Sequence, residues 1–156
     1  MKIAFIGTGN MGGALAKAAS AETANELLLV NRHPEKAERL RAAIGGTVTT
    51  HEAAIADADI IFLGVKPVVF PELCASIRGA VEKRLGKASE ENAPVLLVSM
   101  VSGVTIAEIR SQLGENCPII RIMPNTPAMV GAGCMVLCSD TDFTQEEKME
   151  FLLIIV

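Results

Sequence analysis

A glycine-rich turn near the N-terminus is the first feature of this sequence whose residue types and spacing could do chemistry. Gly7, Gly9 and Gly12 stand in the order G-x-G-x-x-G, directly after the apolar run Lys2–Ile6 and at the start of a segment with helical periodicity. In this context the first glycine permits a tight turn, the second lets a phosphate approach the backbone, and the third lets a helix pack close to a strand. A helix N-terminus also offers amide groups and partial positive charge to a phosphate. The pattern predicts a dinucleotide site, with an ordinary glycine-rich turn as the alternative.

The end of the second apolar run indicates which dinucleotide would bind. Sites of this type that bind NAD carry an acidic residue about 20 residues after the glycines, where it hydrogen-bonds the ribose 2′-hydroxyl. Here the run Glu26–Asn31 is followed by Arg32. An arginine can hold a 2′-phosphate with a fork of donors, whereas an acid would repel it. We therefore expect NADP(H), with NAD(H) as the second candidate, unless Arg32 is only a solvated surface residue.

Three further segments follow apolar runs, at the ends of strands where ligands bind in open α/β sheets. They are Gly64–Pro67, Ser99–Val104 and Arg121–Gly133. In the third, two prolines stiffen a turn that presents Asn125 and Thr126. Their amide and hydroxyl groups could bond the carboxamide of a nicotinamide or a nearby substrate. A rigid structural loop would have the same spacing, so both interpretations stay open.

Taken together, these segments resemble the Δ1-pyrroline-5-carboxylate reductase family, the enzymes that make proline. The resemblance runs through nearly the whole chain and rests on Phe5–Gly12, Val65–Pro67, Ser102–Val104 and, most specifically, Arg121–Gly133. It implies NADPH-dependent reduction of the C=N bond of 1-pyrroline-5-carboxylate to L-proline. The cofactor contacts that it implies fall on Ile6, Gly7, Thr8, Gly9, Asn10, Met11, Gly12, Asn31, Arg32, Gly64, Val65, Lys66, Pro67, Met100, Val101 and Ser102.

The same resemblance places Asn125 and Thr126 near the nicotinamide and the substrate, but it assigns no catalytic residue within this chain. Lys66 is a candidate general acid, although a solvated lysine at a strand end is the simpler interpretation. His51 stands where family members often carry an asparagine that contacts the cofactor, so this contact stays open. The proton donor also stays open.

Family members contain a second, all-helical domain, which dimerises and carries a substrate loop and a hydroxyl residue implicated in catalysis. We expect residues 1–156 to form the NADP-binding Rossmann domain and this helical domain to be absent. The apolar residues Phe151–Val156 favour a fragment of a longer protein over an end that packs on a partner. Full-length members self-associate, whereas the oligomeric state of this chain stays open.

Alternating apolar and amphipathic runs must position these residues. They predict strands, and between them helices, in a doubly wound, Rossmann-type α/β fold with a mostly parallel sheet covered on both faces. The predicted strands are Lys2–Ile6, Glu26–Asn31, Thr47–Thr50, Asp59–Val65, Pro94–Met100, Cys117–Met123 and Gly133–Cys138. Helices are expected over 10–20, 34–44 and His51–Asp57, around Phe70–Val81, after the capping box Thr105–Glu108 and after a second capping box at Thr144–Glu147.

Composition argues against several other classes of protein. The chain has 156 residues, half of them hydrophobic, a net charge of −4 and neither Trp nor Tyr. The negative charge and the scarcity of aromatic residues disfavour nucleic acid as a partner. No apolar run reaches the ~20 residues of a membrane helix, and Gly7 comes too early for a signal peptide, so we expect a cytoplasmic protein.

The four cysteines and two histidines are not spaced as metal ligands, so no metal site is expected. The cysteines are expected to be reduced and mostly buried.

Two other functions stay open. One is a stand-alone NADP-binding or redox-sensing module that does no chemistry. The other is a different Rossmann reductase, related to the β-hydroxyacid dehydrogenases or to the deazaflavin-dependent NADP reductases. The segment Met123–Pro127 discriminates, because it is not expected in that second group.

Overall fold

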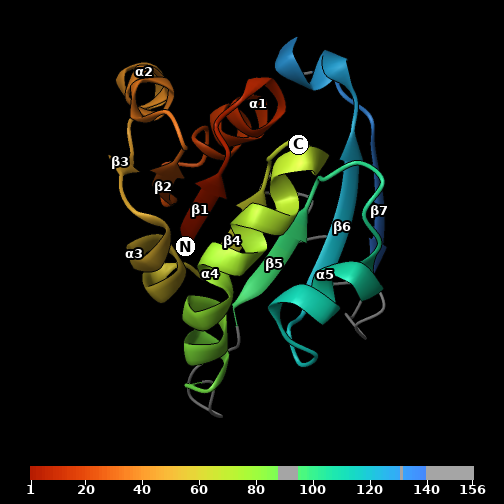
Figure 1. Ribbon diagram of the computed structural model, residues 1–156. Helices are drawn as coiled ribbons and strands as arrows, with labels where there is room; N and C mark the ends of the chain where they lie inside the picture. Colours follow the sequence, from red (N-terminus) through yellow and green to blue (C-terminus); the bar gives the residue numbers. More distant parts are fainter. Residues whose placement is uncertain (88–94, 131, 140–156) are drawn as a thin grey trace.

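The computed structural model describes residues 1–87, 95–130 and 132–139, without the side chains of Met129 and Val130. In these residues seven strands form one sheet in the order β3-β2-β1-β4-β5-β6-β7 (Figure 1). Neighbouring strands are parallel except for β7, which runs antiparallel to β6. The doubly wound, mostly parallel α/β fold predicted from the sequence is thereby confirmed.

The elements follow the predicted order. The strands are β1 (Lys2–Ile6), β2 (Glu26–Val30), β3 (Thr47–Val48), β4 (Ile60–Leu63), β5 (Leu96–Ser99), β6 (Ile119–Pro124) and β7 (Met135–Ser139). The helices are α1 (Asn10–Ala19), α2 (Pro34–Ile44), α3 (His51–Asp57), α4 (Phe70–Leu85) and α5 (Ile106–Leu113), with short 3-10 turns η1 (Pro67–Val69) and η2 (Thr126–Val130). The helix expected after Thr144–Glu147 lies outside the described residues.

The sheet separates two apolar layers. Side chains of α3, α4 and α5 pack on one face, and those of α1 and α2 pack on the other. Strand β4 is buried along its whole length, with Ile61 and Leu63 in the first layer and Ile60 and Phe62 in the second. This burial on both faces explains why the strand reads as a continuous apolar run. In the second layer Phe5 stacks on Phe62 with ring centroids 4.7 Å apart.

Local signals set the ends of several elements. The capping box at α5 forms as predicted, because the Glu108 amide donates to Thr105 Oγ1 (3.2 Å) and the Thr105 amide donates to Glu108 Oε2 (2.7 Å). The predicted strand Thr47–Thr50 is shorter in the structure, since the Thr50 hydroxyl accepts the amide of Ala53 and caps α3. Hydrogen bonding at a helix start therefore decides where that strand ends.

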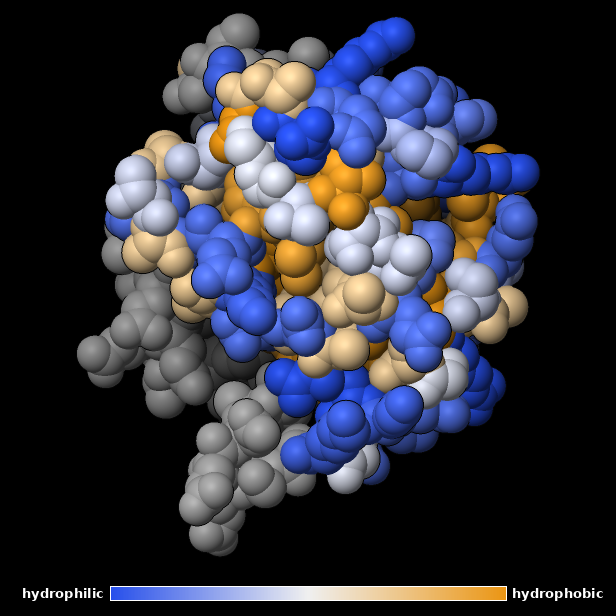
Figure 2. Space-filling model, turned by 90° about the vertical axis from the view of Figure 1, so that its left-hand side faces the viewer, coloured by the Kyte–Doolittle hydropathy of each residue, from blue (hydrophilic) through white to orange (hydrophobic). Residues whose placement is uncertain are grey.

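The exposed side of the helices carries few buried residues and many hydrophilic ones. On α2 only Ala37 is buried, and most of the exposed side chains of that helix are charged. Figure 2 shows hydrophilic side chains around a central group of apolar ones on the face turned to the viewer. None of the helices within the described ranges is long and apolar enough to cross a bilayer.

The cysteines differ partly from the expectation. Cys74 and Cys117 are buried in the core, where burial raises the pKa of their thiols to about 11 and about 12. Cys134 and Cys138 are exposed. For Cys138 the reason is position, because β7 lies at the edge of the sheet and alternate side chains along it face outward. Cys134 stands just before that strand. The prediction of mostly buried thiols therefore holds for half of them.

Candidate functional site

The sheet order reverses beside β1, which places a crevice at the carboxyl ends of its strands. From β1 the chain proceeds outward to β2 and β3, and then returns to the other side of β1 with β4. Crossovers that leave in opposite directions open such a crevice, and ligands of open α/β sheets bind there. A cleft of about 520 Å³ lies at this point.

The cleft brings together many of the residues that the sequence singled out. Those predicted as cofactor contacts that line it are Ile6, Gly7, Gly9, Asn31, Arg32, Gly64, Val65 and Lys66. His51, whose role stayed open, lines it too. Residues that line it without having been predicted are His33, Lys36, Val69, Glu72, Leu73 and Ser76.

Charge distinguishes this cleft from another large hollow among the described residues. That hollow, of about 470 Å³, lies near the amino ends of β2 and β3 and is lined by two acids, Glu22 and Glu26, with no Lys, Arg or His among its described lining residues. The cleft at the carboxyl ends instead carries three cations, Arg32, Lys36 and Lys66, against one acid, Glu72. The cleft at the carboxyl ends therefore favours an anionic ligand, whereas the hollow at the amino ends does not.

The three glycines of the turn differ in what surrounds them. Gly7 has a φ of 98°, and a Cβ there would lie 2.6 Å from the carbonyl oxygen of Gly64. A Cβ on Gly12 would overlap the carbonyl oxygen of Gly7. At Gly9, by contrast, a Cβ would meet nothing within 4 Å. The fold itself requires glycine at Gly7 and Gly12, whereas at Gly9 it leaves open space facing the cleft.

Helix α1 begins at this open space. Gly9 is its N-cap residue and provides no side-chain cap in the described structure, so the first-turn amides remain for an external acceptor. Together with the helix dipole, they suit a phosphate group. The observed geometry of the turn fits a pyrophosphate.

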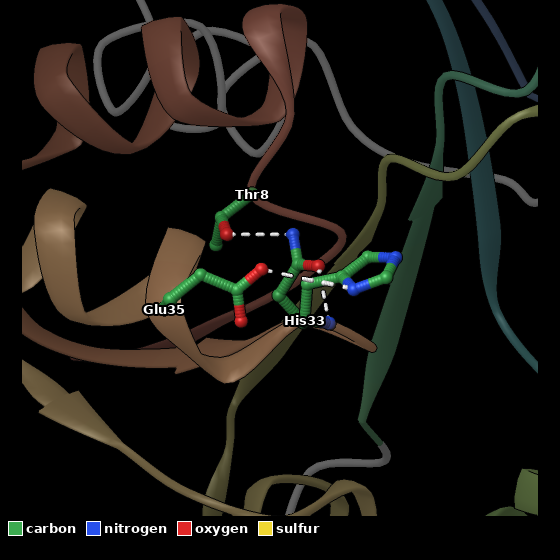
Figure 3. A network of polar contacts seen from close by, with 4 residues as sticks. Thr8, His33 and Glu35 are labelled. Atoms are coloured by element: carbon green, nitrogen blue, oxygen red, sulfur yellow. Dashed lines mark hydrogen bonds and ion pairs between the residues drawn. The ribbon is translucent and has the colours of Figure 1, made fainter.

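A short polar network ties the turn to the end of β2 (Figure 3). The Asn31 amide Nδ2 donates to the buried Thr8 hydroxyl (2.8 Å), and Asn31 Oδ1 accepts the backbone amide of His33 (3.0 Å). His33 Nδ1 lies 3.7 Å from the Glu35 carboxylate. Asn31 thus holds the glycine turn and fixes the backbone on both sides of Arg32. Both Thr8 and Asn31 were predicted as cofactor contacts, and here they bond to each other.

Arg32 extends from the end of β2 and is largely exposed. Its Nη1 lies 3.7 Å from Glu72 Oε2 on α4, and both side chains are about 70% exposed. Ion pairs of this exposure hold a side chain only weakly. The guanidinium therefore remains able to turn toward a ligand in the cleft.

His51 occupies the first position of α3 and also lines the cleft. Partial burial lowers the pKa of its imidazole below the usual 6.5. At neutral pH His51 is accordingly uncharged, and it can donate or accept a hydrogen bond rather than pair with a phosphate.

The predicted residues after β5 lie beside the cleft rather than in its lining. The sulfur of Met100 would be 3.3 Å from a Cβ placed on Gly64, so Met100 packs next to the residue that follows β4. The Val101 side chain is fully buried in the core, and its amide donates to the Ser99 hydroxyl. Pro67 and Ser102 are exposed, and Ser102 stands in a turn. Asn10, Met11 and Gly12 belong to the first turn of α1 and also lie outside the lining of the cleft.

Asn125 and Thr126 lie at the junction of β6 and η2, away from the lining of the cleft. Asn125 Oδ1 accepts the Cys134 amide (2.8 Å), and the Asn125 amide donates to the Cys134 carbonyl (3.2 Å). These bonds clamp the turn against the start of β7 and favour the rigid-loop interpretation for Asn125. A contact of Asn125 and Thr126 with a nicotinamide stays a prediction.

The lining residues that were not predicted from the sequence differ in whether a sequence pattern pointed to them. Lys36 stands in the first turn of a helix that follows the carboxyl end of a strand, a position that predicts exposure at this edge of the sheet. Glu72 gave no such signal, because its place opposite Arg32 depends on how α4 crosses the cleft. Among the described residues, no group of three or more His, Cys, Asp or Glu side chains could hold a metal ion.

Comparison with known proteins adds three findings. Residues 2–103 match the model of the family described as NADP oxidoreductase, coenzyme F420-dependent. A pyrroline-5-carboxylate reductase from Corynebacterium melassecola is 33% identical over 156 residues, which are 97% of this chain and 55% of that protein. The chain thus spans about half the length of such relatives.

Solved structures agree in fold. A pyrroline-5-carboxylate reductase from Coxiella burnetii superimposes with a TM-score of 0.80 at 26% identity, over 97% of this chain and 54% of that one. A pyrroline carboxylate reductase from Plasmodium falciparum, solved with NADP bound, gives a TM-score of 0.77 at 24% identity, over 99% of this chain and 53% of that one.

Proposed function

The chain belongs to the family of NADP oxidoreductases, coenzyme F420-dependent, and from this premise we propose that its 156 residues are the NADP(H)-binding domain of a pyrroline-5-carboxylate reductase. The reaction is reduction of 1-pyrroline-5-carboxylate to L-proline. Support comes from curated reductases of this name that are similar over nearly the whole chain. We propose further that the protein acts in the cytoplasm.

The observation that carries the proposal is the open space at Gly9 above an uncapped helix end. Nothing in the fold fills the position of a Cβ there, while the amides of α1 point to the same place. A pyrophosphate would use both features, because it needs close backbone approach and hydrogen-bond donors. Nicotinamide dinucleotides are the ligands with this requirement that suit the rest of the cleft.

The adenosine end of the cofactor is assigned to the ends of β2 and α2. Arg32 and Lys36 line the cleft there, and both carry positive charge. A 2′-phosphate would contact the Arg32 fork and draw Lys36 toward it. This charge favours NADPH over NADH, whose ribose offers only neutral hydroxyls.

The nicotinamide end is assigned to the opposite side of β1. When bound, NADPH supplies the hydride for the C=N carbon. In this proposal Gly64–Pro67 and Met100–Ser102 orient the ring, with Asn125 and Thr126 nearby. The chain's own contribution is to position the cofactor. Contacts to the substrate carboxylate are proposed to come largely from the part of the relatives that this chain does not span.

A second candidate function is hydride exchange between NADP(H) and a deazaflavin, which the description of the matching family favours. That match ends at residue 103, whereas similarity to the named reductases covers 97% of the chain and so includes the segment Met123–Pro127. Assays with 1-pyrroline-5-carboxylate and with coenzyme F420, each in the presence of NADPH, separate the two.

The first experiment measures binding of NADPH and of NADH by titration calorimetry. We expect wild type to prefer NADPH, and Arg32→Ala to lose about 1.5–3 kcal/mol of NADPH binding free energy, as for a charge-assisted hydrogen bond. Affinity for NADH should stay within about twofold, or ~0.4 kcal/mol.

Arg41→Ala is the matched control, because Arg41 is also exposed and paired with an acid, Glu38, but lies outside the cleft lining. It should leave both affinities unchanged. Equal affinity of wild type for the two nucleotides would remove Arg32 from the site, and binding of neither would end the proposal.

A further inference from the structure

One acidic side chain faces the proposed 2′-phosphate position. Glu72 is the single Asp or Glu among the described residues that line the cleft. It stands in the first turn of α4, across the cleft from the end of β2, and its carboxylate lies 3.7 Å from Arg32. No part of the proposed function uses this residue.

We propose that Glu72 is a specificity-determining residue, which competes with the 2′-phosphate of the cofactor for Arg32 and so moderates the preference for NADPH. This inference rests on the proposed dinucleotide site. It assigns to Glu72 an effect on the phosphate-bearing nucleotide and none on NADH.

The geometry makes this competition direct. Arg32 and Glu72 form the ion pair in the unliganded cleft, and their side chains are 69% and 73% exposed. An exposed pair is weak enough to be broken by a ligand. A phosphate that engages the Arg32 fork through Nη1 competes with the carboxylate, because Nη1 is the guanidinium nitrogen that lies 3.7 Å from Glu72 Oε2.

Charge adds to the effect of this displacement. A phosphate monoester carries about −1.5 to −2 charges near pH 7, and it would lie within a few ångströms of the displaced carboxylate. Repulsion between like charges at this range is moderate in water and is screened by salt. NADH carries no phosphate at this position, and its ribose hydroxyls are neutral, so the Glu72 charge has little effect on it.

The other charged groups of the cleft cannot substitute for this role. Lys36 and Lys66 are cations, and His51 is uncharged at neutral pH. His33 Nδ1 has a carboxylate partner of its own, Glu35, which is not among the lining residues. Among the described lining residues, Glu72 alone opposes an anion.

The test is Glu72→Gln, which removes the charge and keeps the shape. Titration calorimetry should show NADPH and 2′,5′-ADP binding ~3- to 10-fold more tightly than to wild type, and NADH within ~2-fold, as expected for one exposed like-charge interaction. High salt should shrink the gain. In an Arg32→Ala background the gain should be smaller than in wild type, because the competition for Arg32 is lost and only the screened repulsion between carboxylate and phosphate remains.

Glu82→Gln is the control on the same helix. Glu82 is an exposed acid that pairs with an arginine, Arg78, but lies outside the cleft lining. It should leave the NADPH affinity unchanged. Circular dichroism verifies that each variant is folded.

Three results would overturn the inference. Unchanged NADPH affinity in Glu72→Gln would show that the carboxylate does not compete. Weaker NADH binding would make Glu72 a ribose ligand instead. An equal gain of NADPH affinity in Glu82→Gln would show that the effect comes from the net charge of the protein and not from the position of Glu72. If wild type binds neither NADPH nor NADH, the proposed function fails and this inference fails with it, whereas failure of Glu72→Gln alone leaves the proposed function intact.

Discussion

At the scale of single residues, the glycines of the turn serve different purposes. Gly12 meets the backbone of Gly7 so closely that no side chain fits. Gly9 has φ −74° and ψ −165°, a conformation open to any residue, and space for a Cβ. Neither conformation nor packing thus explains why Gly9 is a glycine. An external group that approaches the backbone does explain it.

This difference predicts opposite outcomes for two substitutions. Gly9→Val should cost at most about 1 kcal/mol of unfolding free energy, the range for an unfavourable N-cap residue, yet weaken NADPH binding by roughly 100-fold or more because its branches fill the phosphate space. Gly12→Ala should cost about 1–3 kcal/mol of stability through overpacking.

Urea unfolding and nucleotide titration measure the two effects separately. NADPH binding that survives Gly9→Val would place the nucleotide elsewhere in the protein. A Gly12→Ala variant as stable as wild type would mean that α1 can move away from the turn.

At the scale of elements, Asn125 makes three hydrogen bonds that hold the turn between β6 and β7, one through its side chain and two through its backbone. Asn125 closes it through two bonds with Cys134, and a third links its carbonyl to the amide of Ala128. A Cβ on Gly133 would lie 2.8 Å from Ala128, so the two sides of the turn are in close contact. This rigidity keeps Asn125 and Thr126 in a defined position at the carboxyl end of the sheet.

Asn125→Ala separates the structural role from a nicotinamide contact. Loss of the bond to the Cys134 amide should lower the unfolding free energy by about 1 kcal/mol. If Asn125 also contacts the nicotinamide, NADPH affinity should fall by ~5-fold or more while affinity for 2′,5′-ADP, which lacks that ring, stays unchanged.

Calorimetry with the two ligands gives the comparison. Equal losses for both would mean that the substitution disturbs the whole cleft, and an unchanged NADPH affinity would leave Asn125 with the structural role alone.

At the scale of the whole molecule, the sheet is a rigid layer, and the proposed cofactor site lies along the edge formed by the carboxyl ends of its strands. Helices cover both of its faces, so the strand ends are the exposed polar positions near the centre of the fold. The chain spans about half the length of its relatives, 55% in one example. A platform of this kind positions a cofactor, but holding a small substrate against it requires a second surface.

We therefore expect the 156 residues by themselves to bind NADPH and to reduce 1-pyrroline-5-carboxylate far more slowly than a typical enzyme rate of ~10 s⁻¹. Lost positioning of the imine against the nicotinamide is the physical reason. The measurement is NADPH oxidation followed by absorbance, with NADPH binding measured on the same sample. Turnover near the typical rate would show that this half already holds a full active site.

The sequence by itself determined the order and type of the elements, the glycine turn and the capping box of α5. These features depend on periodicity, backbone sterics and hydrogen bonds between residues a few positions apart, so a local pattern carries them. Identification of Arg32 as a cleft residue followed in the same way, because the end of a parallel strand fixes which edge of the sheet it occupies.

Only the tertiary structure decided which distant side chains meet. Glu72 and Arg32 are far apart in sequence, and they face each other because the start of α4 and the end of β2 line the same cleft. Cys138 is exposed because β7 is an edge strand, and Asn125 faces Cys134 because β7 turns back antiparallel to β6. Such contacts depend on the packing of whole elements, which no short stretch of sequence encodes.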